Sequence, residues 1–288
     1  MPKTILLTGG NRGLGFATAS RLLRAGHRLV ITTRTASARN DAVKRLRAVA
    51  SDASVEGYVV DLASQTSVRA VAKEILAAGH QFDVLHHNAG VLMPPETRTL
   101  TDDGLEVTLQ VNAVAPMALT MLLRPALNES ARITAVGSSL HMPSGRGVQV
   151  DFSFDDPNLE QRYGSRLAYK NSKLALMWIM AELDRRLAPG HRADVISPGF
   201  IPTTAAAQLR GLKKFVMGVV MPRTPVATSL DSAAASVAYL LGSSALGGPD
   251  DGGRYFRDGV PAQPSEDAQD SDLAKRFWDY AADAIGQG

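Results

Sequence analysis

Cysteine is absent from this chain of 288 residues, and its absence excludes several kinds of chemistry. Without a thiol there is no disulfide bond, no thiolate metal site and no cysteine nucleophile. A cytoplasmic location fits this composition, and it is the location that we expect.

Long uncharged apolar runs and clusters of basic residues are missing as well. The first ten residues, MPKTILLTGG, hold only a short apolar run, so they predict neither a signal peptide nor a spanning helix. Charge or proline interrupts the later apolar runs, and we expect no integral membrane segment. The net charge is +3, and Lys and Arg are scattered, which gives nucleic-acid binding no support.

The chain does contain a regular alternation of short β-rich stretches and longer helical patterns. Strands are predicted at 4–8, 28–33, 58–60, 84–87, 132–137, 193–197 and 254–256. Helices are predicted at 13–25, 38–50, 66–78, 105–123, 167–187, 229–241 and 272–285, with a bend at Pro116. This alternation predicts an α/β fold, a single doubly wound (Rossmann) domain over 1–288 with a parallel seven-stranded sheet and helices on both faces.

A glycine-rich turn, TGGNRGLG at residues 8–15, lies between the first predicted strand and the first predicted helix. Glycines let the backbone approach a pyrophosphate, and the following helix directs free N–H groups at it. At this position the turn indicates a dinucleotide site. Its predicted cofactor contacts are Gly9, Asn11, Arg12, Gly13, Leu14 and Gly15.

The ends of the next two strands indicate which dinucleotide binds. Arg34 follows the second strand, where an acidic residue would favour NAD and an arginine favours the 2′-phosphate of NADP. Arg12 is placed to approach the same phosphate. Asp61, after the third strand, is expected to accept a hydrogen bond from the adenine amino group. The alternative for both arginines is a solvated surface position, and we predict NADP(H) as the cofactor.

Tyr169 and Lys173 stand four residues apart in a stretch that favours a helix. On a helix they would share one face, where the ammonium favours the phenolate. Such a pair makes tyrosine a usable acid or base near neutral pH. Taken alone, the stretch favours an ordinary helix that happens to carry both residues.

Seven blocks in order decide between these interpretations. They are TGGNRGLG, DL at 61–62, NAG at 88–90, Asn112 in VNAVAP, GSS with Ser138 and Ser139, YKNSK at 169–173, and PGFIPT at 198–203. Together they resemble the short-chain dehydrogenase/reductase family. TDDGLEVTLQVN, ending at Asn112, SSLH, ending at His141, and the tail from Gly253 to Trp278 are similar to its retinol dehydrogenase and protochlorophyllide reductase-like branch.

The resemblance implies four catalytic residues. Tyr169 would exchange a proton with the substrate oxygen, Ser138 would hold that oxygen, Lys173 would lower the pKa of the tyrosine and bond the nicotinamide ribose, and Asn112 would support a water linked to Lys173. It also implies cofactor contacts beyond the glycine turn and the ribose site. These are Leu62, Asn88, Ala89, Gly90, Tyr169, Lys173, Pro198, Gly199, Ile201 and Thr203.

The chain departs from the family pattern in two places. His86 and His87 precede Asn88, where the family often has a further asparagine; because neighbouring strand residues face opposite sides, we expect no metal site. Residues 141–166 form an inserted loop that would either cover the site or block a dimer surface.

The segment 202–224 is expected to shape the substrate pocket, because it follows the last cofactor block and varies within the family. Its apolar residues indicate a mixture of two interpretations, packing on the core and a lipophilic pocket or lid: Leu209, Leu212, Phe215, Val216, Val219, Val220 and Met221. A helical tail is expected over 260–288.

The sequence therefore predicts an NADP(H)-dependent oxidoreductase that acts on a carbonyl or alcohol group of a largely apolar small molecule, in the ketone-reducing direction. The alternative is a non-catalytic NADP(H)-binding sensor or scaffold. Whether the chain forms a homo-oligomer stays open.

Overall fold

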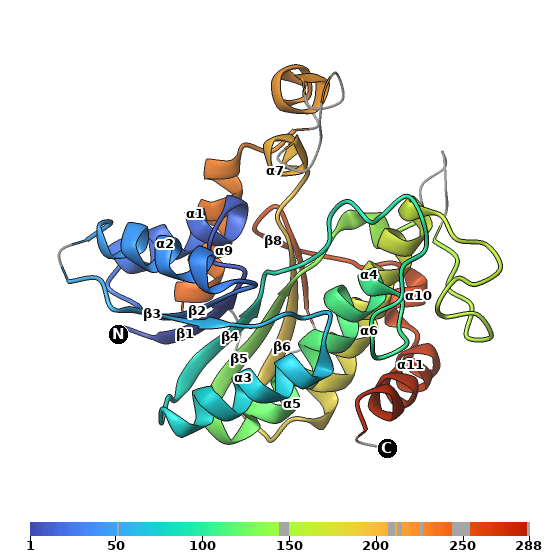
Figure 1. The fold of residues 1–288 in the computed structure, drawn as a ribbon, viewed down its shortest axis with the longest axis horizontal. Coiled ribbons are helices and arrows are strands. Elements are labelled where there is room, and N and C mark those ends of the chain that lie inside the picture. The colour runs from blue at the N-terminus through green and yellow to red at the C-terminus, as the bar shows by residue number, and fades with distance from the viewer. Residues whose placement is uncertain are drawn as a thin grey trace.

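The structure is a computed structural model that describes every residue except 51, 144–149, 207–210, 212–214, 225–226, 244–253 and 287–288. The strands found in these residues are β1 Thr4–Thr8, β2 Arg28–Thr33, β3 Val55–Val59, β4 Phe82–His87, β5 Leu127–Val136, β6 Arg192–Ser197, β7 Tyr255–Arg257 and β8 Val260–Ala262. They form one sheet in the order β3-β2-β1-β4-β5-β6-β7-β8, parallel from β1 to β7. The predicted doubly wound parallel sheet is confirmed (Figure 1).

β8 corrects the predicted count of seven strands and the expected helical tail from residue 260 onward. It pairs antiparallel with β7 through a turn at Asp258 and Gly259, whose φ angles are 51° and 86°. Two consecutive residues with positive φ make the tight turn that suits twisted antiparallel strands. The Asp-Gly pair is a hairpin signal, but a strand of three residues is too short for an alternating pattern to reveal it.

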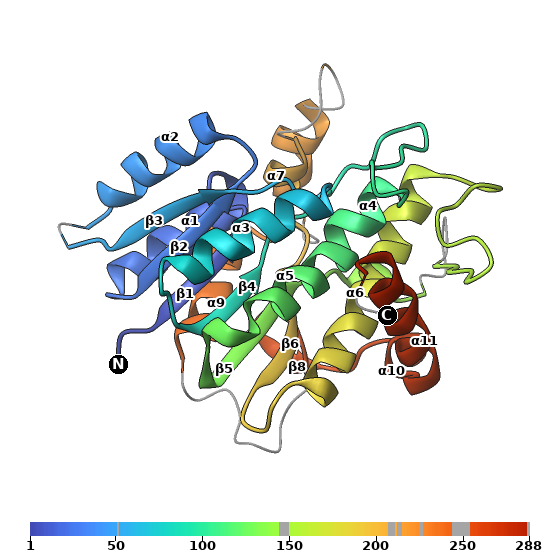
Figure 2. The same ribbon diagram turned by 60° about the horizontal axis from the view of Figure 1, so that its bottom comes forward.

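Helices cover both faces of the sheet. The helices are α1 Gly13–Arg24, α2 Ala36–Arg47, α3 Gln65–Ala77, α4 Val107–Leu109, α5 Ala115–Leu123, α6 Ser165–Arg186, α7 Pro202–Ala206, α9 Leu230–Gly242, α10 Glu266–Gln269 and α11 Ser271–Ala284. α1, α2 and α9 pack on one face, and α3, α5 and α6 pack on the other (Figures 1 and 2). The chain changes direction across the sheet between β1 and β4, which is where doubly wound sheets bind ligands.

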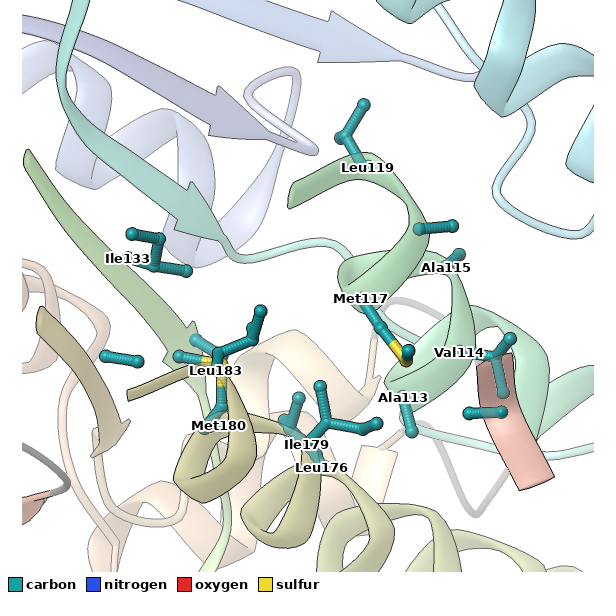
Figure 3. Packing of buried hydrophobic residues seen from close by; sticks show 14 of the residues in the cluster. Ala113, Val114, Ala115, Met117, Leu119, Ile133, Leu176, Ile179, Met180 and Leu183 are labelled. Atoms are coloured by element: carbon teal, nitrogen blue, oxygen red, sulfur yellow. The ribbon is translucent and has the colours of Figure 1, made fainter. Parts of the chain in front are cut away.

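α6 is buried along most of its length, because it lies between the sheet and the carboxyl-terminal helices. Figure 3 shows Leu176 and Ile179 of α6 on the side of Met117 of α5, and Leu183 of α6 on the side of Ile133 of β5. α11 covers the outer side of α6 with buried aromatic side chains, among them Phe277. This packing holds α6 rigidly, and α6 carries the predicted Tyr169 and Lys173.

The helix predicted at 105–123 begins later and is irregular. α4 is followed by a π-helical turn, η1 (Gln110–Val114), and only then by α5. Pro116 stands in the first turn of α5, where its missing N–H is tolerated, so the irregularity lies one turn before the expected bend. Single π-helical turns often accompany functional residues, and this one contains Asn112.

One stretch of the described residues, Val107–Ala126, is long and apolar enough to cross a membrane. However, 72% of its most apolar window is buried within the protein. Its apolar side chains belong to the core beneath α6, which accounts for their character without a membrane.

The inserted loop at 141–166 packs its aromatic residues against the carboxyl-terminal helices. Phe152 lies 5.3 Å from Trp178 of α6 and 5.3 Å from Phe277 of α11, measured between ring centroids, and Phe154 lies 5.8 Å from Trp178. The described part of the loop therefore adds to the core on the α6 side.

Candidate active site

Glycines shape the turn between β1 and α1. Gly9 has a φ of 74° and Gly13 a φ of 53°, a backbone region that residues with a Cβ atom avoid. A Cβ atom on Gly15 would lie 2.3 Å from the Gly9 carbonyl oxygen and 2.5 Å from Nδ2 of Asn88. Only glycine at position 15 lets α1 begin this close to the turn.

The amino terminus of α1 offers N–H groups to an anion. Arg12 is the N-cap residue, its side chain makes no capping hydrogen bond, and the first turn holds no acidic residue. The helix dipole adds positive potential at the same place, which suits a phosphate. Asn11 is half-buried in the turn, whereas the Leu14 side chain is buried in the core, so Leu14 presents only its backbone.

The residues predicted to contact the adenosine side lie at the same edge of the sheet. Arg12 and Arg34 are both exposed, after the neighbouring strands β1 and β2. Asp61 is exposed after β3, and its Oδ1 accepts a hydrogen bond of 3.0 Å from the N–H of Ala63. Leu62 is buried and packs in the core.

Hydrogen bonds fix the segment after β4 to the glycine turn. Nδ2 of Asn88 donates to the carbonyl oxygens of Thr8 and Gly9, at 2.9 and 3.3 Å. Oγ1 of Thr8 accepts from the N–H groups of Asn88 and Ala89, both at 3.0 Å. Asn88 therefore holds the ends of β1 and β4 together at the point where the sheet order reverses.

Asn112 connects the segment after β4 to α6. Its Oδ1 accepts from the N–H of Val91 at 2.7 Å, and its Nδ2 donates to Oγ of Ser172 at 2.9 Å. A Cβ atom on Gly90 would lie 3.0 Å from Oδ1 of Asn112, so a small residue is needed there. The side chain is buried and fully engaged, which fixes its position beside the pair on α6.

Ser138 and Tyr169 meet where β5 ends. The Ser138 side chain is hydrogen-bonded to the Tyr169 phenol, and Oγ of Ser138 accepts from the N–H of Leu140 at 3.2 Å. Tyr169 is 9% exposed. Ser139 is exposed and begins the short helix η3 (Ser139–His141). Of the two adjacent serines, Ser138 is the one whose side chain meets Tyr169.

Lys173 lies on the same face of α6 as Tyr169. Its Nζ donates to the carbonyl oxygen of Val136 at 2.8 Å and lies 5.8 Å from the centre of the Tyr169 ring. The spacing of four residues brings the two side chains together, as a helix requires. Lys173 is almost completely buried, so its charge has little competition from water.

Burial controls the protonation of this pair. It raises the pKa of Tyr169 to about 12, against the opposing effect of the Ser138 hydrogen bond, and it lowers the pKa of Lys173 to about 8. The family resemblance implies a lowered pKa for the phenol, but in the protein itself the pKa of the phenol is raised, because desolvation outweighs the Ser138 hydrogen bond. At pH 7 Tyr169 is a phenol and Lys173 is mostly an ammonium ion.

The block after β6 lies at the same end of the sheet. Gly199 has a φ of 81°, and a Cβ atom there would lie 2.1 Å from Oγ1 of Thr228. Pro198 and Ile201 are buried, and Thr203 is exposed on α7. Thr203 therefore lies at the surface, at the end of the sheet that carries the other predicted residues.

Further residues of the site were not predicted from the sequence. Oγ1 of Thr204 is buried without a hydrogen-bond partner, and its Cγ2 lies 3.4 Å from a Cβ position on Gly13, so the chain after β6 returns to the glycine turn. Thr8 opens the glycine motif and Ser172 lies inside YKNSK, so both were visible in the sequence. The contact of Lys173 with the carbonyl oxygen of Val136 could not be predicted, because every residue has a backbone carbonyl group.

His86 and His87 face opposite sides of β4, as predicted. His86 is hydrogen-bonded through Nδ1 to Oγ1 of Thr134, and His87 through Nε2 to Oγ1 of Thr120, both at 2.8 Å. Burial lowers the pKa of each to about 3, so both rings are neutral. In the described part of the chain, no three His, Asp or Glu residues come together as metal ligands would.

The segment 202–224 is described in part. Leu209, Arg210, Leu212, Lys213 and Lys214 lie outside the described residues. Phe215 is 56% exposed, and Val216, Val219 and Val220 are 39–46% exposed. Figure 1 shows α7 and the turn after it projecting away from the sheet. Of the two interpretations, packing on the core does not hold for these four side chains.

The comparisons with known proteins agree with this arrangement. The family model described as enoyl-(acyl carrier protein) reductase matches residues 9–247. The chain is 34% identical to "Retinol dehydrogenase 14" of Mus musculus over 99% of its own length and 86% of that protein's length. The chain belongs to the short-chain dehydrogenase/reductase family. The family predicted from the seven blocks is therefore confirmed.

Other members of this family extend the comparison. The chain is 32% identical to "Polyprenol dehydrogenase" of Mus musculus, over 99% of the chain and 84% of that protein. A short-chain dehydrogenase from Burkholderia cenocepacia, solved in complex with NADP, is 25% identical with a TM-score of 0.65 and is covered over 97% of its length, against 90% of this chain. An uncharacterized protein from Mycobacterium paratuberculosis is 28% identical with a TM-score of 0.76, over 99% of this chain and 93% of that one.

Proposed function

We propose that this member of the family is an NADP(H)-dependent oxidoreductase that reduces a carbonyl group of a largely apolar small molecule. The observation that carries the proposal is the convergence of Ser138, Tyr169, Lys173 and Asn112 around one end of α6. The substrate oxygen gains alkoxide character during reduction. It can be stabilised and protonated where a hydroxyl donor, a tyrosine and a buried cation come together.

The residues around the glycine turn fit NADP(H). Gly15 has no room for a side chain, Gly9 and Gly13 have positive φ angles that disfavour one, and the first turn of α1 is free of acidic groups. When bound, the cofactor would supply or accept the hydride. Arg12 and Arg34 would pair with its 2′-phosphate, and a solved relative in complex with NADP supports this choice.

The remaining contacts follow the order of the strands. Asp61 and Leu62 would meet the adenine, the first through its carboxylate and the second through its backbone. The backbone from Asn88 to Gly90 would pass beside the cofactor. Tyr169 and Lys173 would bond the nicotinamide ribose. The carboxamide would be held by Pro198, Gly199, Ile201 and Thr203.

Tyr169 supplies the proton in the proposed reaction. Because burial raises its pKa to about 12, it is protonated at pH 7 and ready to donate to the substrate oxygen. Ser138 holds the same oxygen, and the Lys173 ammonium stabilises the negative charge left on the phenolate. These protonation states support the ketone-reducing direction.

The apolar character of the substrate is proposed from the side chains at the carboxyl end of the sheet. Met93, Leu140 and Phe200 follow β4, β5 and β6, and each is about 40% exposed: 41%, 44% and 39%. Exposed large apolar residues around a site favour an apolar ligand. Relatives whose names refer to retinol and polyprenol support the same substrate class.

A cytoplasmic location is part of the proposal, as is a single domain over residues 1–288. The sensor alternative needs an incomplete catalytic set, and Asn112, Ser138, Tyr169 and Lys173 are all present. The decisive experiment follows loss of NADPH absorbance with a panel of ketones and aldehydes. Turnover of an apolar ketone by wild type supports the proposal, whereas tight NADPH binding with no turnover across the panel would establish a sensor.

A further inference from the structure

His141 is a buried histidine that the proposed reaction does not use. It is the last residue of η3, it has no exposed surface, and its ring packs edge-on against Tyr255 of β7 with centroids 5.1 Å apart. Its Nδ1 lies 2.6 Å from the carbonyl oxygen of Ser138, and its Nε2 lies 3.3 Å from the backbone N of Ser265. One ring therefore contacts both the Ser138 backbone and the carboxyl-terminal segment.

These two partners define the tautomer of the ring. The backbone N–H of Ser265 can only donate, so Nε2 of His141 must accept. The neutral ring then carries its proton on Nδ1, which donates to the carbonyl oxygen of Ser138. Burial lowers the pKa of His141, which keeps the ring in this neutral form.

The segment that meets His141 also contacts α6. Ser265 caps α10 by accepting from the N–H of Ala268 at 3.3 Å. Two residues after Ser265, the carbonyl oxygen of Asp267 accepts a hydrogen bond of 2.7 Å from Nε1 of Trp178 on α6. The same carboxyl-terminal turn is thus bound to the loop of Ser138 and to the helix of Tyr169.

We infer that His141 is a positioning residue: its ring sets the orientation of Ser138 and transmits the position of the carboxyl-terminal segment to the active site. Its effect on turnover rests on the proposed function, but its tautomer and its two hydrogen bonds do not. The His141 ring holds the Ser138 peptide by its hydrogen bond to the carbonyl oxygen. The hydroxyl group that contacts Tyr169 belongs to the same residue, so the orientation of the peptide sets the position of the hydroxyl. A small rotation of that peptide would move the hydroxyl away from the substrate oxygen.

Two substitutions separate the two hydrogen bonds. In His141→Asn the amide can replace Nδ1 and donate to Ser138, but it cannot reach Ser265. In His141→Gln the amide can replace Nε2 and accept from Ser265, but it loses the side-chain bond to Ser138, whose carbonyl oxygen keeps only the weaker contact of 3.3 Å with the backbone N–H of residue 141. We expect His141→Asn to retain most of kcat, and His141→Gln to lower kcat about tenfold or more with KM and the Kd of NADPH within about twofold. Equal losses in both variants, in proportion to their loss of Tm, would show a purely structural role and overturn the inference.

A double-mutant cycle with Ser138→Ala tests whether His141 acts through Ser138. Once the hydroxyl is gone, His141→Gln should lower kcat little further; a full additional tenfold loss would overturn the inference. Nitrogen NMR of the wild-type ring supplies a readout without turnover. We expect a neutral ring with the proton on Nδ1, and the opposite tautomer would overturn the inference even if the enzyme is active. Absence of turnover in wild type, with the expected tautomer present, would count against the proposed function alone.

Discussion

At the scale of single residues, Tyr169 illustrates how surroundings decide a role. Burial is the main cause that raises its pKa to about 12, which makes the phenol a poor base but leaves it protonated as an acid. Ser138 acts in the opposite direction through its hydrogen bond, and Lys173 supplies a cation 5.8 Å from the ring. The sequence identifies all three residues, but it cannot weigh burial against attraction, because burial depends on the whole fold.

Replacing Tyr169 with phenylalanine should remove turnover and little else. The ring would keep its packing on α6, and only the group that transfers the proton would be lost. We expect kcat to fall about a hundredfold or more, while Tm stays close to wild type and the Kd of NADPH changes far less than kcat, by no more than the loss of one ribose contact. Tyr239→Phe on α9 is the matched control, because Tyr239 is 64% exposed. Wild-type turnover in Tyr169→Phe would contradict the proposed role.

Because of Lys173, the kcat of ketone reduction should change with pH near pH 8. Its pKa is lowered to about 8, so the stabilising ammonium is present below this pH and lost above it. Tyr169 stays protonated through this range, since its pKa is raised to about 12. Wild-type kcat should therefore fall as the pH rises through about 8. In Lys173→Met kcat should be lower and flat across this range, and a limb that persists in the variant would assign the titration to another group.

Arg34 should make the protein prefer NADPH over NADH. A charge-assisted contact with the 2′-phosphate contributes about 1.5–3 kcal/mol, and the exposure of Arg34 places it at the lower end. Arg34→Ala should therefore weaken NADPH about tenfold and leave NADH nearly unchanged. Arg24→Ala, at the other end of α1, is the control for a lost surface charge. Equal affinities of wild type for both cofactors would refute the assignment.

At the scale of elements, local patterns predicted the parallel strands and most helices, with shifts of a few residues at their ends. Two features were missed because they depend on contacts across the chain. β8 is only three residues long and exists as a strand because β7 lies beside it. The π-helical turn at Gln110–Val114 places Asn112 between Val91 and Ser172, and no local pattern announces these partners. The glycine turn could be predicted without such information, because its close backbone approach depends on the small size of glycines that are neighbours in the sequence.

The close approach of α1 to the glycine turn should make Gly15→Ala damaging. The added Cβ would meet the Gly9 carbonyl oxygen at 2.3 Å, and that oxygen belongs to the backbone, which cannot move aside cheaply. We expect a loss of about 1–3 kcal/mol in the free energy of unfolding, together with weaker NADPH binding. Gly164→Ala is the control, since its Cβ would meet only Leu167 at 4.0 Å. A variant as stable as wild type, with unchanged affinity, would contradict this view of the turn.

At the scale of the whole molecule, the site is assembled from segments that lie far apart in the sequence. Asn88 joins the ends of β1 and β4, Asn112 joins β4 to α6, and Lys173 joins α6 to β5. The family blocks name these residues, but only the fold explains why they act together. The same fold leaves large apolar side chains exposed after several strands, and the sequence alone could not place them around one site.

These exposed side chains should give the enzyme a preference for bulky apolar substrates. Phe200 is 39% exposed after β6, and covering the rest of its ring with substrate would contribute about 1 kcal/mol. For wild type, kcat/KM should rise with the apolar size of the ketone. Phe200→Ser should lower kcat/KM about fivefold for the largest ketone and leave the smallest nearly unchanged. Leu76→Ser is the control, because Leu76 is 36% exposed near the carboxyl end of α3, at the opposite end of the sheet. A wild-type preference for small charged ketones would refute the proposed substrate class while leaving the roles of Tyr169 and Lys173 intact.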